Sequence, residues 1–154
     1  MPTNAPTAEP FTPEPPTVEP FTPLPPTEQD STPPPPAADL VLTGTAVKSD
    51  YGSDGASCDV SVNVQLTIKP DGKAYLTATG PDITDHYNCT STGEETWYLE
   101  GTADAANQTV SFAACNFGGF TAQGSLSYAG QALSGTSGCL SSDGKQAVRL
   151  VFGD

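Results

Sequence analysis

Apolar and polar residues alternate along much of the chain after residue 37. The clearest run covers residues 58–69, Cys-Asp-Val-Ser-Val-Asn-Val-Gln-Leu-Thr-Ile-Lys, in which every even position is apolar and every odd position polar. A period of two predicts a strand with one face towards a core and the other towards water. Pro70-Asp71-Gly72-Lys73 then predicts a hairpin turn, because glycine accepts the positive φ that such turns require.

The same alternation predicts seven further strands, and no window shows the spacing of three and four residues that indicates a helix. The predicted strands cover about 39–48, 57–69, 73–80, 94–104, 108–115, 119–129, 131–139 and 145–152. Short strands joined by tight turns predict an all-β fold, a small antiparallel up-and-down meander.

Glycines recur within the predicted strands, at Gly44, Gly101, Gly124 and Gly135. Glycine weakens a strand unless the strand must bend or a neighbour must approach closely, so this pattern favours closure into a barrel. A β-sandwich is the alternative. Because several inward positions are only Ala or Gly, the interior of the barrel could be filled or could hold one small ligand.

The first 36 residues differ from the rest in composition, since they hold 14 of the 16 prolines and no Lys, Arg or Cys. We therefore divide the chain into a Pro/Thr-rich stalk, 1–36, and a β domain, 37–154. Proline prevents helix and sheet from propagating, which predicts a disordered or polyproline II segment that could reach on the order of 100 Å. Evenly spaced threonines suit O-glycosylation: Thr7, Thr12, Thr17, Thr22, Thr27 and Thr32. The repeats around Phe11 and Phe21 could instead be a docking motif.

The net charge is −13, with acidic residues in both parts of the chain. Nucleic-acid binding depends on Lys and Arg neutralising phosphates, so no nucleic-acid partner is expected. Anionic membrane surfaces are disfavoured for the same reason.

The four cysteines are expected to form two disulfides near one end of the meander. The strand order brings Cys58 near Cys89 and Cys115 near Cys139, so these are the predicted pairs. Each bridge would stabilise the domain by about 2–4 kcal/mol. A zinc site is disfavoured, because the spacings contain no Cys-x-x-Cys unit.

We expect an extracytoplasmic protein, secreted or anchored at the cell surface. A Pro/Thr-rich stalk and an even number of cysteines in a small β domain suit an oxidising compartment. No stretch approaches the ~18–20 apolar residues of a membrane span. An export signal is therefore expected upstream of this chain in its precursor, and a lipid anchor there is one mode of attachment to the surface.

No enzyme and no cofactor are expected. His86 is the only histidine, lies in a polar segment expected to be a loop, 81–93, and has no nucleophile motif beside it. Zinc enzymes usually need two or three histidines. A carboxylate-based hydrolase is the residual alternative, because Glu94, Glu95 and Glu100 surround Trp97. Alternation places Glu94, Tyr98 and Glu100 on one face and Glu95, Trp97 and Leu99 on the other.

Asp50, Asp54 and Asp59 form a candidate calcium site, although their spacing does not match the EF-hand loop and favours a simple acidic turn. The leading hypothesis for function is a non-catalytic binding module on a stalk, with an unidentified protein or carbohydrate partner at the cell surface. Candidate ligand contacts are Tyr51, Tyr75, His86, Tyr87 and Tyr98. The alternatives are a structural subunit of a surface layer or fibre that adds strands at a sheet edge, and a hydrolase inhibitor.

Overall fold

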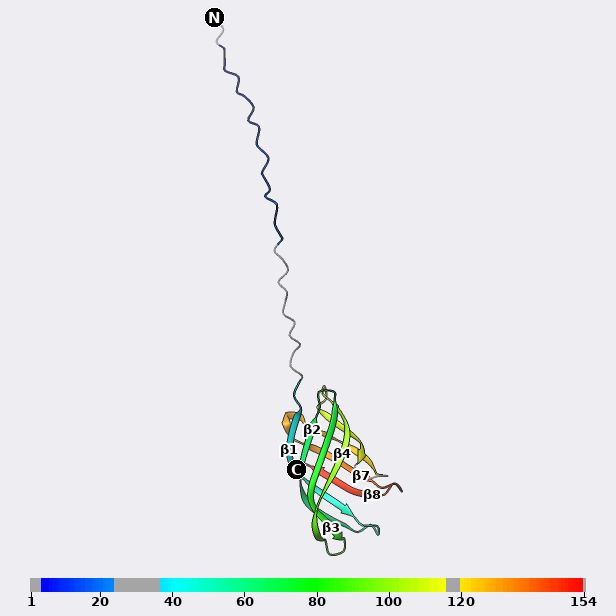
Figure 1. Ribbon diagram of the computed structural model, residues 1–154. Coiled ribbons are helices and arrows are strands. Elements are labelled where there is room, and N and C mark those ends of the chain that lie inside the picture. Colours follow the sequence, from blue (N-terminus) through cyan, green and yellow to red (C-terminus); the bar gives the residue numbers. More distant parts are fainter. Residues whose placement is uncertain (1–3, 24–36, 116–119, 154) are drawn as a thin grey trace. The chain divides into compact units, whose positions relative to one another are not determined.

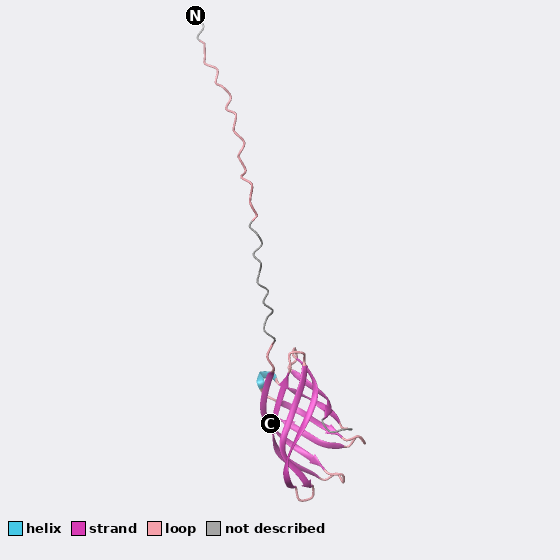
Figure 2. Cartoon of the chain, in the orientation of Figure 1, coloured by secondary structure: helices cyan, strands magenta, loops and turns pink. Residues whose placement is uncertain are grey.

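The computed structural model describes residues 4–23, 37–115 and 120–153. The chain divides into two units, residues 1–34 and 35–154. The second unit contains eight antiparallel strands and one short 3-10 helix, η1 (Figure 2). The elements are β1 Leu40–Tyr51, β2 Ser57–Ile68, β3 Lys73–Asp85, β4 Thr90–Asp104, β5 Thr109–Cys115, β6 Thr121–Ser127, η1 Ala129–Gln131, β7 Ser134–Leu140 and β8 Gln146–Phe152.

The strands form a closed up-and-down barrel in which each strand pairs with its neighbours in sequence (Figure 1). Closure is made by β1, which pairs with β2 along its whole length and with β8 from Ala46 to Asp50. The predicted all-β barrel is thus confirmed, and the sandwich alternative is wrong. Two expectations need correction: β3 and β4 extend well into the expected loop 81–93, and a 3-10 turn stands where no helix was expected.

Inward side chains of the strands fill the interior of the barrel, and burial alternates most regularly along β2 and β3. In β2 the even positions from Val62 to Ile68 are buried while the odd ones face out. Fully buried leucines and valines from β2 to β8 complete the core: Leu66, Leu76, Leu99, Val110, Leu126, Val148 and Leu150. Among the described residues, the polar side chains of Lys48, Asp50 and Ser137 are buried with them.

Two disulfides cross-link the barrel wall in the predicted pairs. Cys58 of β2 is bonded to Cys89 in the turn between β3 and β4, with Cα atoms 5.5 Å apart. Cys115 of β5 is bonded to Cys139 of β7, with Cα atoms 6.3 Å apart. All four cysteines are therefore used as bridges and none is available as a metal ligand.

Three of the four repeated strand glycines occupy positions where a side chain would collide with a neighbouring strand. A Cβ atom on Gly101 would lie 2.1 Å from the Ser111 carbonyl oxygen, beside a register shift between β4 and β5. Gly124 and Gly135 have φ of +92° and +115° and are also closely approached by backbone. Gly44 is the exception, because the nearest atom to its Cβ position is 3.8 Å away.

The described part of the stalk, residues 4–23, has no helix or strand, and its side chains are exposed. Thr7, Thr12, Thr17 and Thr22 are among these residues, whereas Thr27 and Thr32 lie outside the described residues. The Phe11 and Phe21 side chains are fully exposed. Within the described ranges, no helix is long and apolar enough to cross a bilayer.

Replacing Gly124 by alanine should lower the free energy of unfolding by about 1–3 kcal/mol, because the residue has a positive φ and its Cβ would lie 2.3 Å from the Thr136 carbonyl oxygen. Gly93→Ala in β4 is the control, since nothing lies within 4 Å of its Cβ position. It should change stability by less than about 0.5 kcal/mol. Urea unfolding followed by Trp97 fluorescence measures both, and equal effects would contradict the role given to Gly124.

Candidate functional site

The five candidate ligand contacts fall into two separate groups. Tyr51 ends β1, and His86 and Tyr87 lie in the turn between β3 and β4. Tyr75 and Tyr98 lie instead on the outward faces of β3 and β4, between buried inward residues. The candidate contacts named from the sequence therefore lie at two places on the barrel, and their role as ligand contacts stays a prediction.

The turn between β3 and β4 is organised by one carboxylate. The Asp85 Oδ1 atom accepts hydrogen bonds from the backbone N–H groups of Tyr87, at 2.9 Å, and Asn88, at 3.2 Å. Its Oδ2 atom accepts a hydrogen bond from the Asn88 side-chain amide at 2.7 Å. These bonds, the side-chain amide of Asn88 first, hold the pKa of Asp85 below its ordinary value. Cys89 follows with a φ of +52° and turns the chain into β4.

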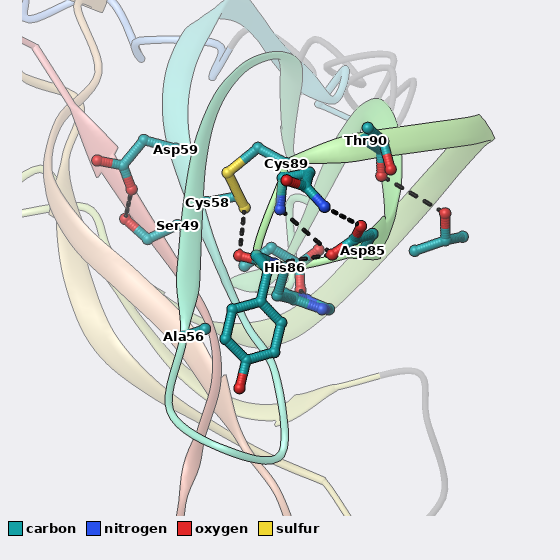
Figure 3. Close-up of a disulfide and its surroundings, with 12 residues drawn as sticks. Ser49, Ala56, Cys58, Asp59, Asp85, His86, Cys89 and Thr90 are labelled. Atoms are coloured by element: carbon teal, nitrogen blue, oxygen red, sulfur yellow. Dashed lines mark hydrogen bonds and ion pairs between the residues drawn. A yellow bond between two sulfur atoms is a disulfide. The ribbon is translucent and has the colours of Figure 1, made fainter.

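The disulfide fastens this turn to the neighbouring strand. Figure 3 shows Cys89 joined to Cys58 of β2, with the Asp85 hydrogen bonds beside it. The Cys58 sulfur lies 3.3 Å from the His86 carbonyl oxygen, so it contacts the turn at two points. A covalent link and a hydrogen-bonded carboxylate together leave residues 85–89 little conformational freedom. We call these five residues the anchored turn.

Tyr87 projects from the anchored turn with 81% of its surface exposed. Its hydroxyl interacts with Asp54 in the loop between β1 and β2, and this interaction lowers the pKa of Asp54 and raises the pKa of Tyr87. Asp54 also accepts a hydrogen bond from the Ala56 N–H at 3.1 Å. The two loops border a cleft of about 260 Å³, lined by Gly52, Ser53, Asp54, Thr84, Asp85, His86 and Tyr87.

A buried ion cluster lies on the inside of the wall near the anchored turn. Lys48 is completely buried, and its Nζ atom lies 3.0 Å from Asp50 Oδ2 and 3.0 Å from the Pro81 carbonyl oxygen. The same ammonium is bonded to Glu95 Oε1. His86 Nε2 lies 3.1 Å from Asp50 Oδ1 and so joins the cluster to the turn. The cluster thus ties β1, β3 and β4 together.

The sequence reasoning missed this cluster, although a signal was present. Lys48 and Asp50 continue the inward positions Leu42 and Ala46 of β1, but the strand was expected to end at residue 48. Glu95 was placed correctly on the face of Trp97 and Leu99, but its partner was not identified. Glu94 and Glu100 face outward on β4, as expected.

The cluster has little capacity left for a ligand. Each of the three N–H groups of a lysine ammonium has an acceptor here, and Asp50 is shared between Lys48 and His86. Pairing and hydrogen bonding are what a charge requires in order to be buried at all. The arrangement therefore fits a structural role, holding the end of the barrel and orienting the His86 side chain.

The candidate calcium ligands do not come together. Asp50 points inward to Lys48, Asp54 lies in the loop with Tyr87, and Asp59 faces outward and accepts a hydrogen bond from Ser49 at 2.6 Å. Strand alternation explains the separation, because Asp50 and Asp59 lie on opposite faces of the wall. Over the described residues, no group of three or more His, Cys, Asp or Glu side chains could hold a metal ion.

No protein-family model matches this chain, and no similar curated protein or solved structure was found. Its function must therefore be inferred from its own geometry.

Replacing Lys48 by methionine should lower the free energy of unfolding by about 3–5 kcal/mol, because Asp50 and Glu95 would lose the cation between them. Lys69→Met is the matched control. The Lys69–Asp39 pair is exposed, so its loss should leave stability nearly unchanged. Thermal and urea unfolding followed by circular dichroism measure the difference, and two variants of equal stability would refute the role of the cluster.

Replacing Tyr87 by phenylalanine should raise the pKa of Asp54 towards its ordinary value of 3.8, because the tyrosine hydroxyl is the largest cause of its lowering. A carboxyl whose pKa is lowered in the folded state stabilises the fold at pH values above its ordinary pKa. This contribution is lost as the pH falls through the folded-state pKa. Carboxyl ¹³C NMR titration measures the shift. In the same spectra the pKa of Asp104 should stay lowered, because Asn107 is its largest cause. An unchanged Asp54 would contradict the contact.

Proposed function

We propose that this chain is a non-catalytic extracytoplasmic binding module that contacts a partner protein through the anchored turn. The observation that supports this most directly is an 81% exposed tyrosine on a turn held by a disulfide and by Asp85. Tyrosine is enriched among the residues that dominate binding energy, because its ring is large and amphipathic.

The rigidity of the turn supports a binding role more than exposure alone does. Ordering a loop on association opposes binding, so a segment already fixed in the free protein loses less entropy. Here Asp85 accepts a hydrogen bond from the Tyr87 backbone N–H, and the disulfide at Cys89 fastens the end of the turn to β2. The backbone that carries the Tyr87 ring is thus fixed before any partner arrives.

Two disulfides favour an oxidising compartment. In this proposal the Pro/Thr-rich stalk holds the barrel away from the surface to which the chain is attached, and O-linked glycans on its threonines stiffen it. Phe11 and Phe21 are then exposed spacer residues and not docking residues.

The ion cluster supports a non-catalytic role. His86 is bonded to Asp50, and Lys48 is bonded to Asp50, Glu95 and Pro81. These groups satisfy one another at the inner wall, which is how structural charges are buried. A hydrolase inhibitor that uses the same exposed, disulfide-held turn is the second candidate. A closed barrel has no edge strand, which does not favour a fibre subunit that grows by strand addition.

The test compares the full chain with Tyr87→Ser and with Val47→Ser, which removes an exposed apolar side chain elsewhere on the barrel. Each immobilised protein is incubated with the secreted and surface proteins of the source organism, and bound proteins are quantified by mass spectrometry. We expect a partner retained by the wild type and by Val47→Ser and reduced about tenfold or more by Tyr87→Ser. Equal retention by all three proteins would overturn the proposal.

A further inference from the structure

The outward faces of β1, β2, β3 and β4 carry three parallel rows of side chains. The strand register sets Thr45, Asn63, Thr79 and Thr96 side by side, then Thr43, Gln65, Thr77 and Tyr98, then Val41, Thr67, Tyr75 and Glu100. Neighbouring strands lie about 4.8 Å apart and successive rows about 6.8 Å apart. We call these twelve residues the outer wall patch.

The outer wall patch is almost free of charge on a strongly acidic protein. Of its twelve side chains only Glu100 is ionised, whereas the whole chain carries 18 Asp and Glu residues. Charged groups lie beyond both ends of the patch, with the Asp39–Lys69 pair on one side and Asp59 on the other. A charge-free centre can be covered by a partner without the desolvation cost of burying an ion.

Hydroxyl and amide groups dominate the outer wall patch. Six of its residues are threonines, and Asn63 and Gln65 are exposed. Some of these groups bond to one another, as the Thr79 and Thr96 hydroxyls do at 2.9 Å. Hydroxyls and amides both donate and accept hydrogen bonds, so they match the hydroxyl groups of a sugar without selecting for charge.

Two tyrosines complete the patch on its β3–β4 side. Tyr75 is directly opposite Glu100, and Tyr98 is directly opposite Thr77, so the two rings are diagonal neighbours. Residues in this relation lie about 7–8 Å apart. The Tyr98 residue is 49% exposed. Aromatic rings of this kind offer an apolar face beside polar groups, which suits the two-sided surface of a sugar ring.

The wall is also hollowed beside the tyrosines. A shallow cleft of about 490 Å³ runs over β1, β2 and β3, lined by Thr43, Gly44, Thr45, Asn63, Val64, Gln65, Thr77 and Thr79.

We propose that the outer wall patch binds an extended, uncharged polysaccharide. The tyrosine rings contact the apolar faces of the sugars, and the threonine, asparagine and glutamine side chains hydrogen-bond to their hydroxyls. The net charge of −13 disfavours acidic polymers, and the patch itself carries one ionised side chain, Glu100, which favours a neutral ligand. This surface is separate from the anchored turn and goes beyond the function proposed above.

The test measures depletion of the full chain from solution by microcrystalline cellulose and by insoluble chitin, with alginate gel as the charged polymer. One variant is Tyr75→Ser with Tyr98→Ser, and a second is Thr43→Glu. Thr136→Glu on the outward face of β7 is the matched control for an added charge. Thermal midpoints within a few degrees of the wild type establish that each variant is folded.

We expect the wild type and Thr136→Glu to bind at least one neutral polymer and not alginate. Both patch variants should bind that polymer with an affinity lowered about tenfold or more. Binding to cellulose alone or to chitin alone distinguishes the two neutral polymers. Failure to bind either neutral polymer, or equal binding by the wild type and both patch variants, overturns the proposal. Loss of a protein partner in Thr43→Glu without any polysaccharide binding would assign the patch to a protein instead.

Discussion

Hydrogen bonding of β1 to both β2 and β8 is the constraint on which the rest of the structure depends. Closing the wall fixes which face of every strand is inside, so the apolar inward residues fill the interior and the residues between them form an outer surface. It also carries Lys48 and Asp50 into the interior with the apolar residues of β1. Glu95 and His86 then have to lie where they can pair with them, because an unpaired buried charge is strongly destabilising.

Two hairpin turns show how tertiary structure gives different roles to one local motif. In both, an aspartate accepts hydrogen bonds from the backbone and side chain of an asparagine three residues later: Asp85 with Asn88, and Asp104 with Asn107. The residue that follows has a φ of +52° in each case. Only the first turn contains a cysteine, bonded to β2, and a tyrosine whose hydroxyl interacts with Asp54 of a second loop. A local hydrogen-bonding pattern thus makes the turn, and distant contacts fix its position.

The distribution of charge on the barrel follows from the same geometry. Inward charges are few and mutually paired, at Lys48, Asp50 and Glu95. Outward acids stand mainly in the turns, where Asp54, Asp85 and Asp104 cap backbone N–H groups and have lowered pKa values. The strands between them can therefore present neutral hydroxyl and amide groups over a wide area. Both proposed binding surfaces depend on this separation.

The sequence alone determined the eight strands, the inward face of β2 and the two disulfide pairs, because alternation and strand order are local or nearest-neighbour properties. Only the tertiary structure decided that residues within 81–93 continue β3 and β4. It also decided that Asp50 and Asp59 lie on opposite faces of the wall. Tyr75 and Tyr98 lie in the paired part of β3 and β4, away from the turn that carries Tyr87. The burial of Lys48 with Glu95 was likewise decided there. These features depend on the register between strands that are distant in sequence. The pattern within one strand does not specify which residue of another strand will lie opposite a given residue.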